Sequence, residues 1–254
     1  MPLTIDLNAD LGEGFGDSHA RLDEALLDLV SSANIACGFH AGDAITMRDT
    51  VRAAKLRGVT IGAHPSYPDI PGFGRRELGL PTKEISRHVA YQIRALREVC
   101  GAEGARLSYV KPHGALYNRA ARDRDAATAV VTAIRDVEAS LTLLGLAKSE
   151  MARAADRAGI AFASEAFVDR AYQSDGTLVP RDQPDAVIHD VKGAVQRAVM
   201  LVKGQTITAD DGSELHISAQ SLCVHGDNAD ASAILRSLNA RLRESGVTIA
   251  PFAA

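Results

Sequence analysis

Tryptophan is absent from this chain of 254 residues, and aromatic residues make up only 4% of it. The apolar interior must therefore consist mainly of Ala, Val, Ile and Leu, which suits packed strands and helices better than an aromatic-rich β-sandwich. The three cysteines, Cys37, Cys100 and Cys223, are odd in number and widely separated, with no C-x-x-C pair. A disulfide scaffold or a cysteine-based zinc site is therefore not expected.

Long apolar runs are also lacking, since no stretch reaches the ~18 consecutive apolar residues that a membrane-spanning helix needs. The segment Met1–Asp10 does not have the basic and then apolar regions of a signal peptide. The net charge is -4, and no run of Lys and Arg forms a basic stripe for nucleic acid. These absences predict a cytoplasmic protein that binds neither membranes nor nucleic acids.

Two well-known catalytic motifs are missing as well. Without a G-x-x-x-x-G-K-[ST] segment, any use of a nucleotide cannot depend on a P-loop. Without a G-x-S-x-G elbow, a serine hydrolase of the α/β-hydrolase type is disfavoured. Gly12, Gly14 and Gly16 resemble a phosphate-binding turn, but the later glycine of a dinucleotide fingerprint is absent and the neighbouring acidic residues would repel phosphate.

Short β-prone runs alternate with helical patterns along most of the chain. The expected strands are Thr4–Leu7, Asn34–Cys37, Val59–Ala63, Leu107–Lys111, Leu141–Leu144, Ile160–Ser164 and Ser221–Val224. A helical pattern from Ile85 to Cys100 places its apolar residues on one face, and Gly101 is expected to end that helix. Further helices are expected at Ala44–Arg57, Arg124–Asp136, Lys148–Ala158, Val187–Val202 and Ala229–Ser245.

Strands that alternate with helices predict right-handed βαβ units and a parallel sheet. We expect a single α/β domain over residues 1–254, with the seven strands closed into an irregular βα barrel or left as an open doubly wound sheet. Periodicity does not choose between these two. The segment Gly204–Ile217 predicts a peripheral β-hairpin that turns at Asp211 and Gly212.

Two segments are too long and too rich in Gly and Pro to be simple connections. His64–Pro81 and Phe167–Pro184 each follow an expected strand. Loops of this length in a compact domain usually have a function. Because both follow strands of one parallel sheet, they should lie over the same face of it.

Polar or titratable residues occur at the ends of six of the seven expected strands. They are Asp6, Asn8, Asp10 and Glu13 after the first strand, His40 and Asp43 after the second, His64 after the third, Lys111 and His113 after the fourth, Glu165, Asp169 and Arg170 after the sixth, and His225 and Asp227 after the last. Parallel α/β sheets bind ligands beyond the carboxyl ends of their strands. The pattern therefore predicts a catalytic pocket at this rim, whereas His88, His189 and His216 are expected to be ordinary packing or surface residues.

Two mechanisms are compatible with such a rim. In the first, Asp10, His40, His64 and His113 bind a divalent metal ion that activates water. In the second, the site is free of metal, a carboxylate and a histidine activate water, and Lys111 and Arg170 stabilise an oxyanion or a phosphate. The sequence does not choose between them.

Seven ordered segments of the chain resemble the LamB/YcsF family of lactam utilisation proteins, which form the A subunit of prokaryotic 5-oxoprolinase. The segments are IDLNADLGEGFG (Ile5–Gly16), NIACGFHAGD (Asn34–Asp43), GAHPSYPD (Gly62–Asp69), FGRR (Phe73–Arg76), YVKPHGALYN (Tyr109–Asn118), EAFVDRAYQSDGTLVPR (Glu165–Arg181) and CVHGDN (Cys223–Asn228). The resemblance extends almost from end to end.

The resemblance implies an irregular seven-stranded barrel similar to those of glycoside hydrolases and polysaccharide deacetylases. It also implies that 5-oxo-L-proline is hydrolysed to L-glutamate and that ATP, bound with Mg²⁺, is the co-substrate. Subunits B and C are the implied partners. The expected catalytic residues are Asp10, Glu13, His40, His64, Lys111 and His113. The expected substrate- and phosphate-binding residues are Asn8, Arg75, Arg76, Glu165, Asp169, Arg170 and His225.

Two other function classes remain open at this stage. One is a stand-alone, metal-dependent amide or carbohydrate deacetylase, which would work without ATP. The other is a non-catalytic subunit that binds 5-oxoproline and presents it to its partners.

Overall fold

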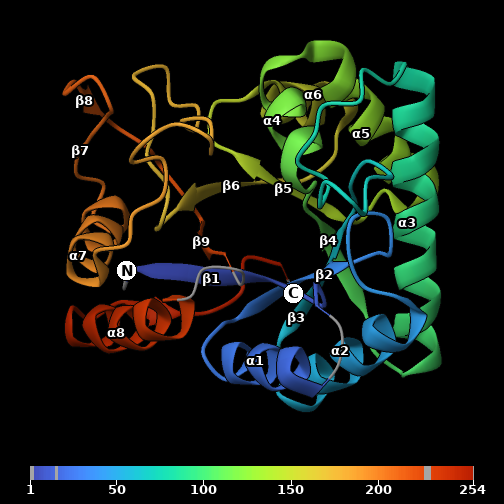
Figure 1. Ribbon diagram of the computed structural model, residues 1–254, viewed down its shortest axis with the longest axis horizontal. Helices are drawn as coiled ribbons and strands as arrows, with labels where there is room; N and C mark the ends of the chain where they lie inside the picture. Colours follow the sequence, from blue (N-terminus) through green and yellow to red (C-terminus); the bar gives the residue numbers. More distant parts are fainter. Residues whose placement is uncertain (1–2, 15–16, 226–229, 254) are drawn as a thin grey trace.

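A closed ring of parallel strands forms the centre of the molecule, as Figure 1 shows. The computed structural model describes residues 3–14, 17–225 and 230–253. The ring consists of β1 (Thr4–Leu11), β2 (Ser32–Ala36), β3 (Thr60–His64), β4 (Leu107–Val110), β5 (Thr142–Leu146), β6 (Phe162–Phe167) and β9 (Ser221–Val224). It closes where β9 pairs with β1 in parallel. The prediction of a seven-stranded βα barrel is confirmed, and the open sheet is excluded.

Helices surround this barrel. They are α1 (Asp17–Leu27), α2 (Ala44–Leu56), α3 (Thr82–Ala102), α4 (Gly114–Arg122), α5 (Arg124–Glu138), α6 (Glu150–Ala158), α7 (Val191–Val202) and α8 (Ala231–Glu244). Their apolar faces and the outward side chains of the strands form one continuous core. No helix in the described part of the chain is both long and apolar enough to cross a membrane.

Three details of the helices differ from the expectations. Gly101 does not end α3, which continues to Ala102 before the chain turns at Gly104 with a φ of 62°. Val187 is not helical, because its backbone forms an antiparallel bridge with Arg170 instead. Helix α4 is not expected from the sequence, because the Pro112–Gly114 segment resembles a turn rather than the start of a helix.

The first strand is longer than its expected range of Thr4–Leu7. It continues to Leu11, so Asn8 and Asp10 lie within β1 and not beyond its end. Ile5 and Leu7 belong to the apolar core outside the barrel, whereas the alternate residues point into the barrel and form hydrogen bonds there. Because successive side chains of a strand point to opposite faces, this alternation makes the interior of the barrel polar.

The amino-terminal end of the barrel is closed by apolar side chains. Tyr109, Leu144 and Ala163 form a small cluster inside the ring, and Phe252 packs against it with its ring centroid 5.0 Å from that of Tyr109. The short strand β10 (Thr248–Ile249) pairs with β1 and guides the carboxyl-terminal segment to this position. The pocket described below lies at the opposite end of the barrel, where the strands have their carboxyl ends.

The ring of Tyr109 fits inside the barrel because residue 62 has no side chain. A Cβ atom at Gly62 would overlap the Tyr109 ring. We expect Gly62→Ala to lower the free energy of unfolding by about 1–3 kcal/mol, the usual cost of overpacking a core. Urea denaturation measures this change. In Gly101→Ala, by contrast, the new Cβ meets open space on a helix, so stability should stay equal or rise by up to about 1 kcal/mol. Equal stabilities of the two variants would contradict the packing argument.

The carboxyl ends of the strands are covered by two long loops, residues 65–81 between β3 and α3 and residues 168–190 between β6 and α7. The second loop is braced by the antiparallel bridge between Tyr172 and Leu178. The predicted hairpin is confirmed: β7 (Ile207–Thr208) and β8 (Glu214–Leu215) pair antiparallel, and Gly212 turns with a φ of 83°. Figure 1 shows this hairpin at the periphery, away from the barrel opening.

Candidate active site

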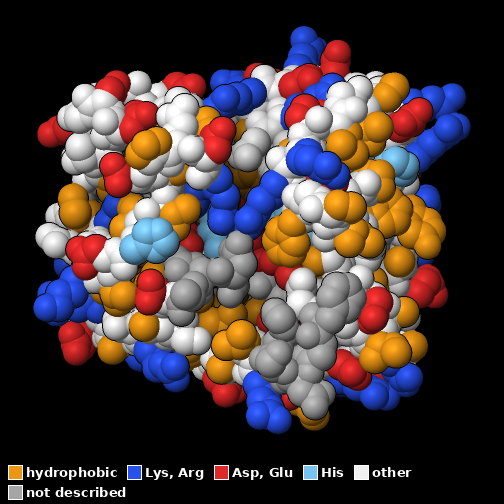
Figure 2. Space-filling view, in the orientation of Figure 1, with side chains coloured by type: hydrophobic (Ala, Val, Ile, Leu, Met, Phe, Trp, Pro, Cys, Tyr) orange, Lys and Arg blue, Asp and Glu red, His pale blue; other side chains and the backbone are white. Residues whose placement is uncertain are grey.

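A pocket of about 430 Å³ lies at the carboxyl ends of the strands, beneath the two long loops. Figure 2 looks onto this side of the molecule, where basic side chains surround a central hollow with a histidine visible inside it. The pocket is lined by Asp10, His64, Arg75, Lys111, Pro112, His113, Gly114, Ala115, Tyr117, Asn118, Phe167, Arg170, Leu178, Pro180, Arg181, Asp182 and His225. The predicted rim is therefore a cavity, and most of the expected site residues face it.

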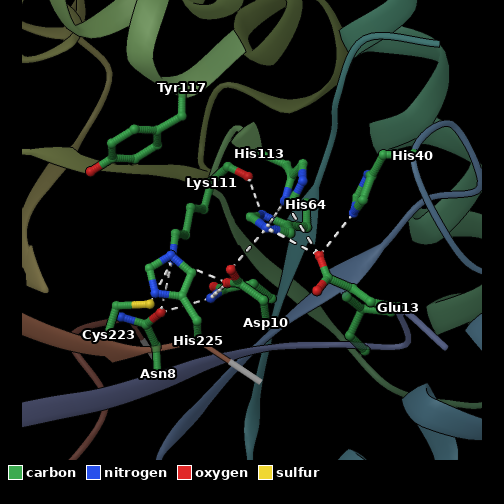
Figure 3. A network of polar contacts seen from close by, with 12 residues as sticks. Asn8, Asp10, Glu13, His40, His64, Lys111, His113, Tyr117, Cys223 and His225 are labelled. Atoms are coloured by element: carbon green, nitrogen blue, oxygen red, sulfur yellow. Dashed lines mark hydrogen bonds and ion pairs between the residues drawn. The ribbon is translucent and has the colours of Figure 1, made fainter. Parts of the chain in front are cut away.

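Lys111 extends from the end of β4 into the barrel, where it meets two buried carboxylates, Glu165 and Asp10. Figure 3 shows its side chain next to Asp10. Its Nζ lies 3.1 Å from Asp10 Oδ1 and 2.8 Å from Glu165 Oε1. It also donates a hydrogen bond of 3.2 Å to Asn8 Oδ1. Glu165 completes its own contacts by accepting from Tyr117 Oη at 3.0 Å. The ammonium group is thus fixed at the floor of the pocket.

Charge balance keeps Lys111 and Asp10 ionised despite their burial. Burial opposes the charged form of Lys111, but Asp10 and Glu165 outweigh it and hold the lysine pKa well above its usual value. Burial likewise opposes ionisation of Asp10, while His64 and Lys111 outweigh it and hold the carboxyl pKa well below its usual value. An ionised carboxylate and a positive ammonium therefore face the pocket together at physiological pH.

Beside this ion pair lies a second group, Glu13, His40, His64 and His113, which we call the histidine cluster. Glu13 Oε1 lies 2.9 Å from His40 Nε2 and 3.3 Å from His113 Nδ1. His64 Nε2 lies 3.4 Å from Asp10 Oδ2, so the cluster adjoins the Lys111 network. One potential ligand atom from each of the four side chains lies within 4.8 Å of the others, a grouping that can hold a metal ion.

Backbone carbonyls orient two of the imidazole rings. His64 Nδ1 lies 2.8 Å from the carbonyl oxygen of Lys111, and His113 Nε2 lies 2.9 Å from that of Phe73. Because a carbonyl oxygen only accepts hydrogen bonds, each of these ring nitrogens must carry the proton. The other nitrogen of each ring then points into the cluster. Phe73 can present its carbonyl here because its backbone adopts a φ of 53°.

Burial also determines the charge of the rings. It lowers the pKa of His40 and of His113 well below the usual value, and neighbouring histidines add to the effect. Both rings are therefore neutral at physiological pH, which is the form that accepts protons or binds metal ions. His40 stacks on His113 with ring centroids 3.8 Å apart and an interplanar angle of 7°.

Two of the three predicted arginines reach the pocket. Arg75 lines it from the first long loop, with its guanidinium carbon 4.9 Å from the centroid of Phe73. Arg170 lines it from the second loop and donates to the carbonyl oxygens of Val179 and Ala186 at 2.6 and 3.1 Å. Arg76 is not among the residues that line the pocket. Its guanidinium pairs with Asp69, and its side chain is 62% exposed.

Asp169 and His225 form a pair at the side of the pocket. His225 Nδ1 lies 2.9 Å from Asp169 Oδ1, and the imidazole stacks on Phe167 with ring centroids 5.2 Å apart. Asp169 is not among the residues that line the pocket, and its contact with His225 positions that ring. Asp227, also expected at this rim, lies outside the described residues.

Sequence reasoning missed three residues of the site. Tyr117, from α4, and Arg181, from the second loop, line the pocket. Cys223 lies 3.1 Å from Lys111 Nζ, although the sequence presents it only as an unpaired cysteine. The positions of Tyr117 and Arg181 inside segments of the family resemblance, YVKPHGALYN and the long segment ending at Arg181, could have drawn attention to them.

Below the pocket, Asp6 is a buried carboxylate without a cationic partner among its described contacts. It accepts hydrogen bonds from the hydroxyls of Ser31, Ser32 and Ser221. Burial is the largest influence and raises its pKa from 3.8 to about 6, although the three hydroxyls oppose the change. The folded protein therefore binds a proton at Asp6 more tightly than the unfolded chain does.

This shift predicts how stability depends on pH. The stabilisation from a protonated Asp6 is complete below about pH 4 and is lost as the pH rises through about 6. Asp6→Asn cannot ionise, so its stability relative to the parent protein should rise by up to about 3 kcal/mol between pH 4 and pH 8. Urea unfolding of both proteins across this range measures the difference. A difference that stays constant with pH would show that Asp6 titrates normally.

Comparisons with known proteins agree with the resemblance noted from the sequence. Residues 5–254 match the model of the LamB/YcsF family. A relative from Streptomyces avermitilis, named as the A subunit of 5-oxoprolinase, is 51% identical over 98% of this chain and 100% of its own length. A lactam utilization protein from Thermus thermophilus superposes with a TM-score of 0.90 at 40% identity, covering 98% of this chain and 100% of that one.

A more distant solved structure supports the fold alone. The catalytic domain of a peptidoglycan N-acetylglucosamine deacetylase from Eubacterium rectale has a TM-score of 0.54 at 10% identity, covering 99% of this chain and 89% of that one. The expected similarity to deacetylase-type barrels is therefore confirmed. With a family match over nearly the whole length and relatives at about half identity, this chain belongs to the LamB/YcsF family.

Proposed function

We propose that this protein is the A subunit of an ATP-dependent 5-oxoprolinase, which hydrolyses 5-oxo-L-proline to L-glutamate while ATP is converted to ADP and phosphate. The observation that supports this most strongly is the pocket, where Asp10, His64 and Lys111 face a cavity rimmed by Arg75 and Arg170. The name of the Streptomyces avermitilis relative supports the choice of substrate.

The chemistry explains why such a pocket is needed. A five-membered lactam is a stable amide, and water attacks its carbonyl carbon slowly near neutral pH. Phosphorylation of the amide oxygen makes that carbon electrophilic. After water adds to it, the ring C–N bond breaks with protonation of the nitrogen and leaves an acyl phosphate, and a second water releases phosphate to give L-glutamate. The site must therefore bind a multiply charged phosphate and also activate water, which requires cations and a proton acceptor in one cavity.

The residues divide between these two tasks. Arg75, Arg170 and Lys111 supply positive charge for the phosphate and for the oxyanion that develops on the amide oxygen. Asp10 faces the same cavity and lies in contact with His64, so its carboxylate is the acceptor for the proton of the attacking water. Asn8, Glu165, Asp169 and His225 hold these groups in place.

The proposed enzyme has further subunits, because its relative is itself named as one subunit of an enzyme. We propose that subunits B and C complete the site and contribute to the binding of ATP with Mg²⁺. This chain has no P-loop to hold the nucleotide alone. The ATP that the reaction consumes is available in the cytoplasm, which is the compartment that we propose for it.

Reconstitution tests this proposal. The chain mixed with subunits B and C should form L-glutamate from 5-oxoproline only when ATP is present, and each component omitted in turn should stop the reaction. Formation of ADP should accompany that of glutamate. Deacetylation of acetylated sugars by the chain alone, without nucleotide, would instead favour the stand-alone deacetylase. Binding of 5-oxoproline with unchanged turnover in variants of pocket residues would favour a purely presenting subunit.

A further inference from the structure

Ring nitrogens of the histidine cluster and a carboxylate oxygen of Glu13 converge on one point, which we call the focus of the cluster. Hydrogen bonds within the protein do not account for this convergence. The nearest nitrogens of His64 and His113 are Nε2 and Nδ1, which lie 3.0 Å apart. The opposite nitrogens of these rings donate to the carbonyl oxygens of Lys111 and Phe73. Each ring therefore carries its proton on the nitrogen that faces away from the other ring, and the two facing nitrogens present lone pairs to each other. Two lone pairs at this distance repel each other unless a positive ion lies within reach of both.

The other two members of the cluster point to the same place. Glu13 Oε1 lies 2.9 Å from His40 Nε2, 3.3 Å from His113 Nδ1 and 3.9 Å from His64 Nε2. A carboxylate oxygen thus lies among three imidazole nitrogens, as Figure 3 shows. This arrangement adds negative charge where the lone pairs already converge.

His40 is held in the cluster mainly by ring stacking rather than by hydrogen bonds at both nitrogens. Its ring is 1% exposed, and its Nδ1 has no hydrogen-bond partner in the described part of the chain. A buried ring is usually held by hydrogen bonds at its nitrogens, and leaving one unsatisfied carries a free-energy cost. This ring is held instead by its stack on His113, which directs its Nε2 toward the focus of the cluster.

We infer that the histidine cluster binds one divalent transition-metal ion of the zinc class, held by Nε2 of His40, Nε2 of His64, Nδ1 of His113 and the carboxylate of Glu13. Three imidazole nitrogens and one carboxylate oxygen are a donor set that zinc and similar ions favour over Mg²⁺ or Ca²⁺. The carbonyls of Lys111 and Phe73 orient two of the ligand rings, as outer partners do in known metal sites.

This ligand set differs from the one that the sequence suggested, because Glu13 replaces Asp10. Asp10 Oδ1 is already 3.1 Å from Lys111 Nζ, whereas its Oδ2 faces His64. His64 and His113 line the pocket, so an ion that they hold is accessible from it. Such an ion supplies Lewis-acid activation of water and of a carbonyl or phosphoryl oxygen. The catalytic role of the ion rests on the proposed function. The binding of the ion to this chain does not.

Metal binding is measured on the untagged chain alone, without ATP or partner subunits. After treatment with a chelator, the protein is titrated with Zn²⁺ by calorimetry and with Co²⁺ by visible spectroscopy, and Mg²⁺ serves as the comparison ion. We expect about one equivalent of Zn²⁺ or Co²⁺ to bind, with a rise in melting temperature. Mg²⁺ should not compete at similar concentrations.

Matched variants locate the ion. His40→Gln and His113→Gln keep much of the side-chain volume, and each should weaken Zn²⁺ binding at least about 100-fold. Loss of a residue that only orients a ligand typically weakens metal binding up to about 100-fold, so a larger effect identifies a direct ligand. His189→Gln changes an exposed histidine and should bind as the parent does. Circular dichroism checks that each variant is folded. The Co²⁺ spectrum should change in the cluster variants only.

The alternative is a proton held between His64 and His113 in place of a metal ion. Failure of the folded parent protein to take up Zn²⁺ or Co²⁺ would overturn the inference in favour of that proton. Equal binding by His113→Gln and His189→Gln would overturn it too, because the ion would then be bound elsewhere. Neither result determines the outcome of the reconstitution assay, so the metal site and the proposed function are tested separately.

Discussion

Lys111→Met is expected to reduce 5-oxoproline hydrolysis by the reconstituted enzyme about 100- to 1,000-fold and to lower the free energy of unfolding by about 3–5 kcal/mol. The activity falls because the charge that faces the pocket beside Asp10 is lost. The stability falls because Asp10 and Glu165 then share a buried space without their cation. Initial rates and urea denaturation measure the two effects.

Two further variants separate these effects. Adding Glu165→Gln to Lys111→Met removes one unpaired carboxylate, so part of the lost stability should return while the activity stays low. Lys192→Met changes an exposed lysine on α7 and should alter stability by less than about 0.5 kcal/mol. Normal turnover in Lys111→Met would show that the floor of this pocket is not where the chemistry occurs.

Asp10→Asn should leave the fold largely intact while lowering turnover about 100- to 10,000-fold, the usual contribution of a proton acceptor. The amide can still accept from Lys111 and Asn34, whose nitrogens lie 3.1 and 2.8 Å from Asp10 Oδ1. It cannot take a proton from water. Steady-state kinetics should therefore show a fall in kcat, with 5-oxoproline binding by calorimetry changed much less.

The control for this variant is Asp49→Asn, which makes the same change at an exposed position of α2. It should keep normal kinetics. An equal loss in both variants would indicate a general effect on the protein, and unchanged kcat in Asp10→Asn would assign the proton acceptor to another group of the pocket.

Much of this fold follows from short-range sequence patterns. The alternation of strand and helix predicts a parallel sheet, and the rule that parallel sheets bind ligands at their carboxyl ends predicts which end has the site. His64, Lys111 and His113 are identified in this way, and all three line the pocket. Closure of the sheet does not follow from these patterns, since the pairing of β9 with β1 joins opposite ends of the chain. The family resemblance alone implies the closed barrel.

The parts that were missed depend on three-dimensional detail. The predicted first strand is too short because Asn8 and Asp10 interrupt the apolar pattern that marks a strand. In the structure these polar side chains point into the barrel, where they bind Lys111. Tyr117 comes from a short helix next to a proline-containing turn, where sequence patterns are weak. The carbonyl that orients His113 belongs to Phe73, 40 positions away, and its direction is set by the backbone of a loop. Side-chain identity contains no information about such a contact.

The apolar cluster around Phe252 lies at the end of the barrel opposite the pocket. In the reaction that we propose, substrate and products pass through the mouth beneath the two long loops, so product must leave before the next substrate binds. A partner subunit that rests on those loops would control entry and release together, and product release would then limit the turnover of the assembled enzyme.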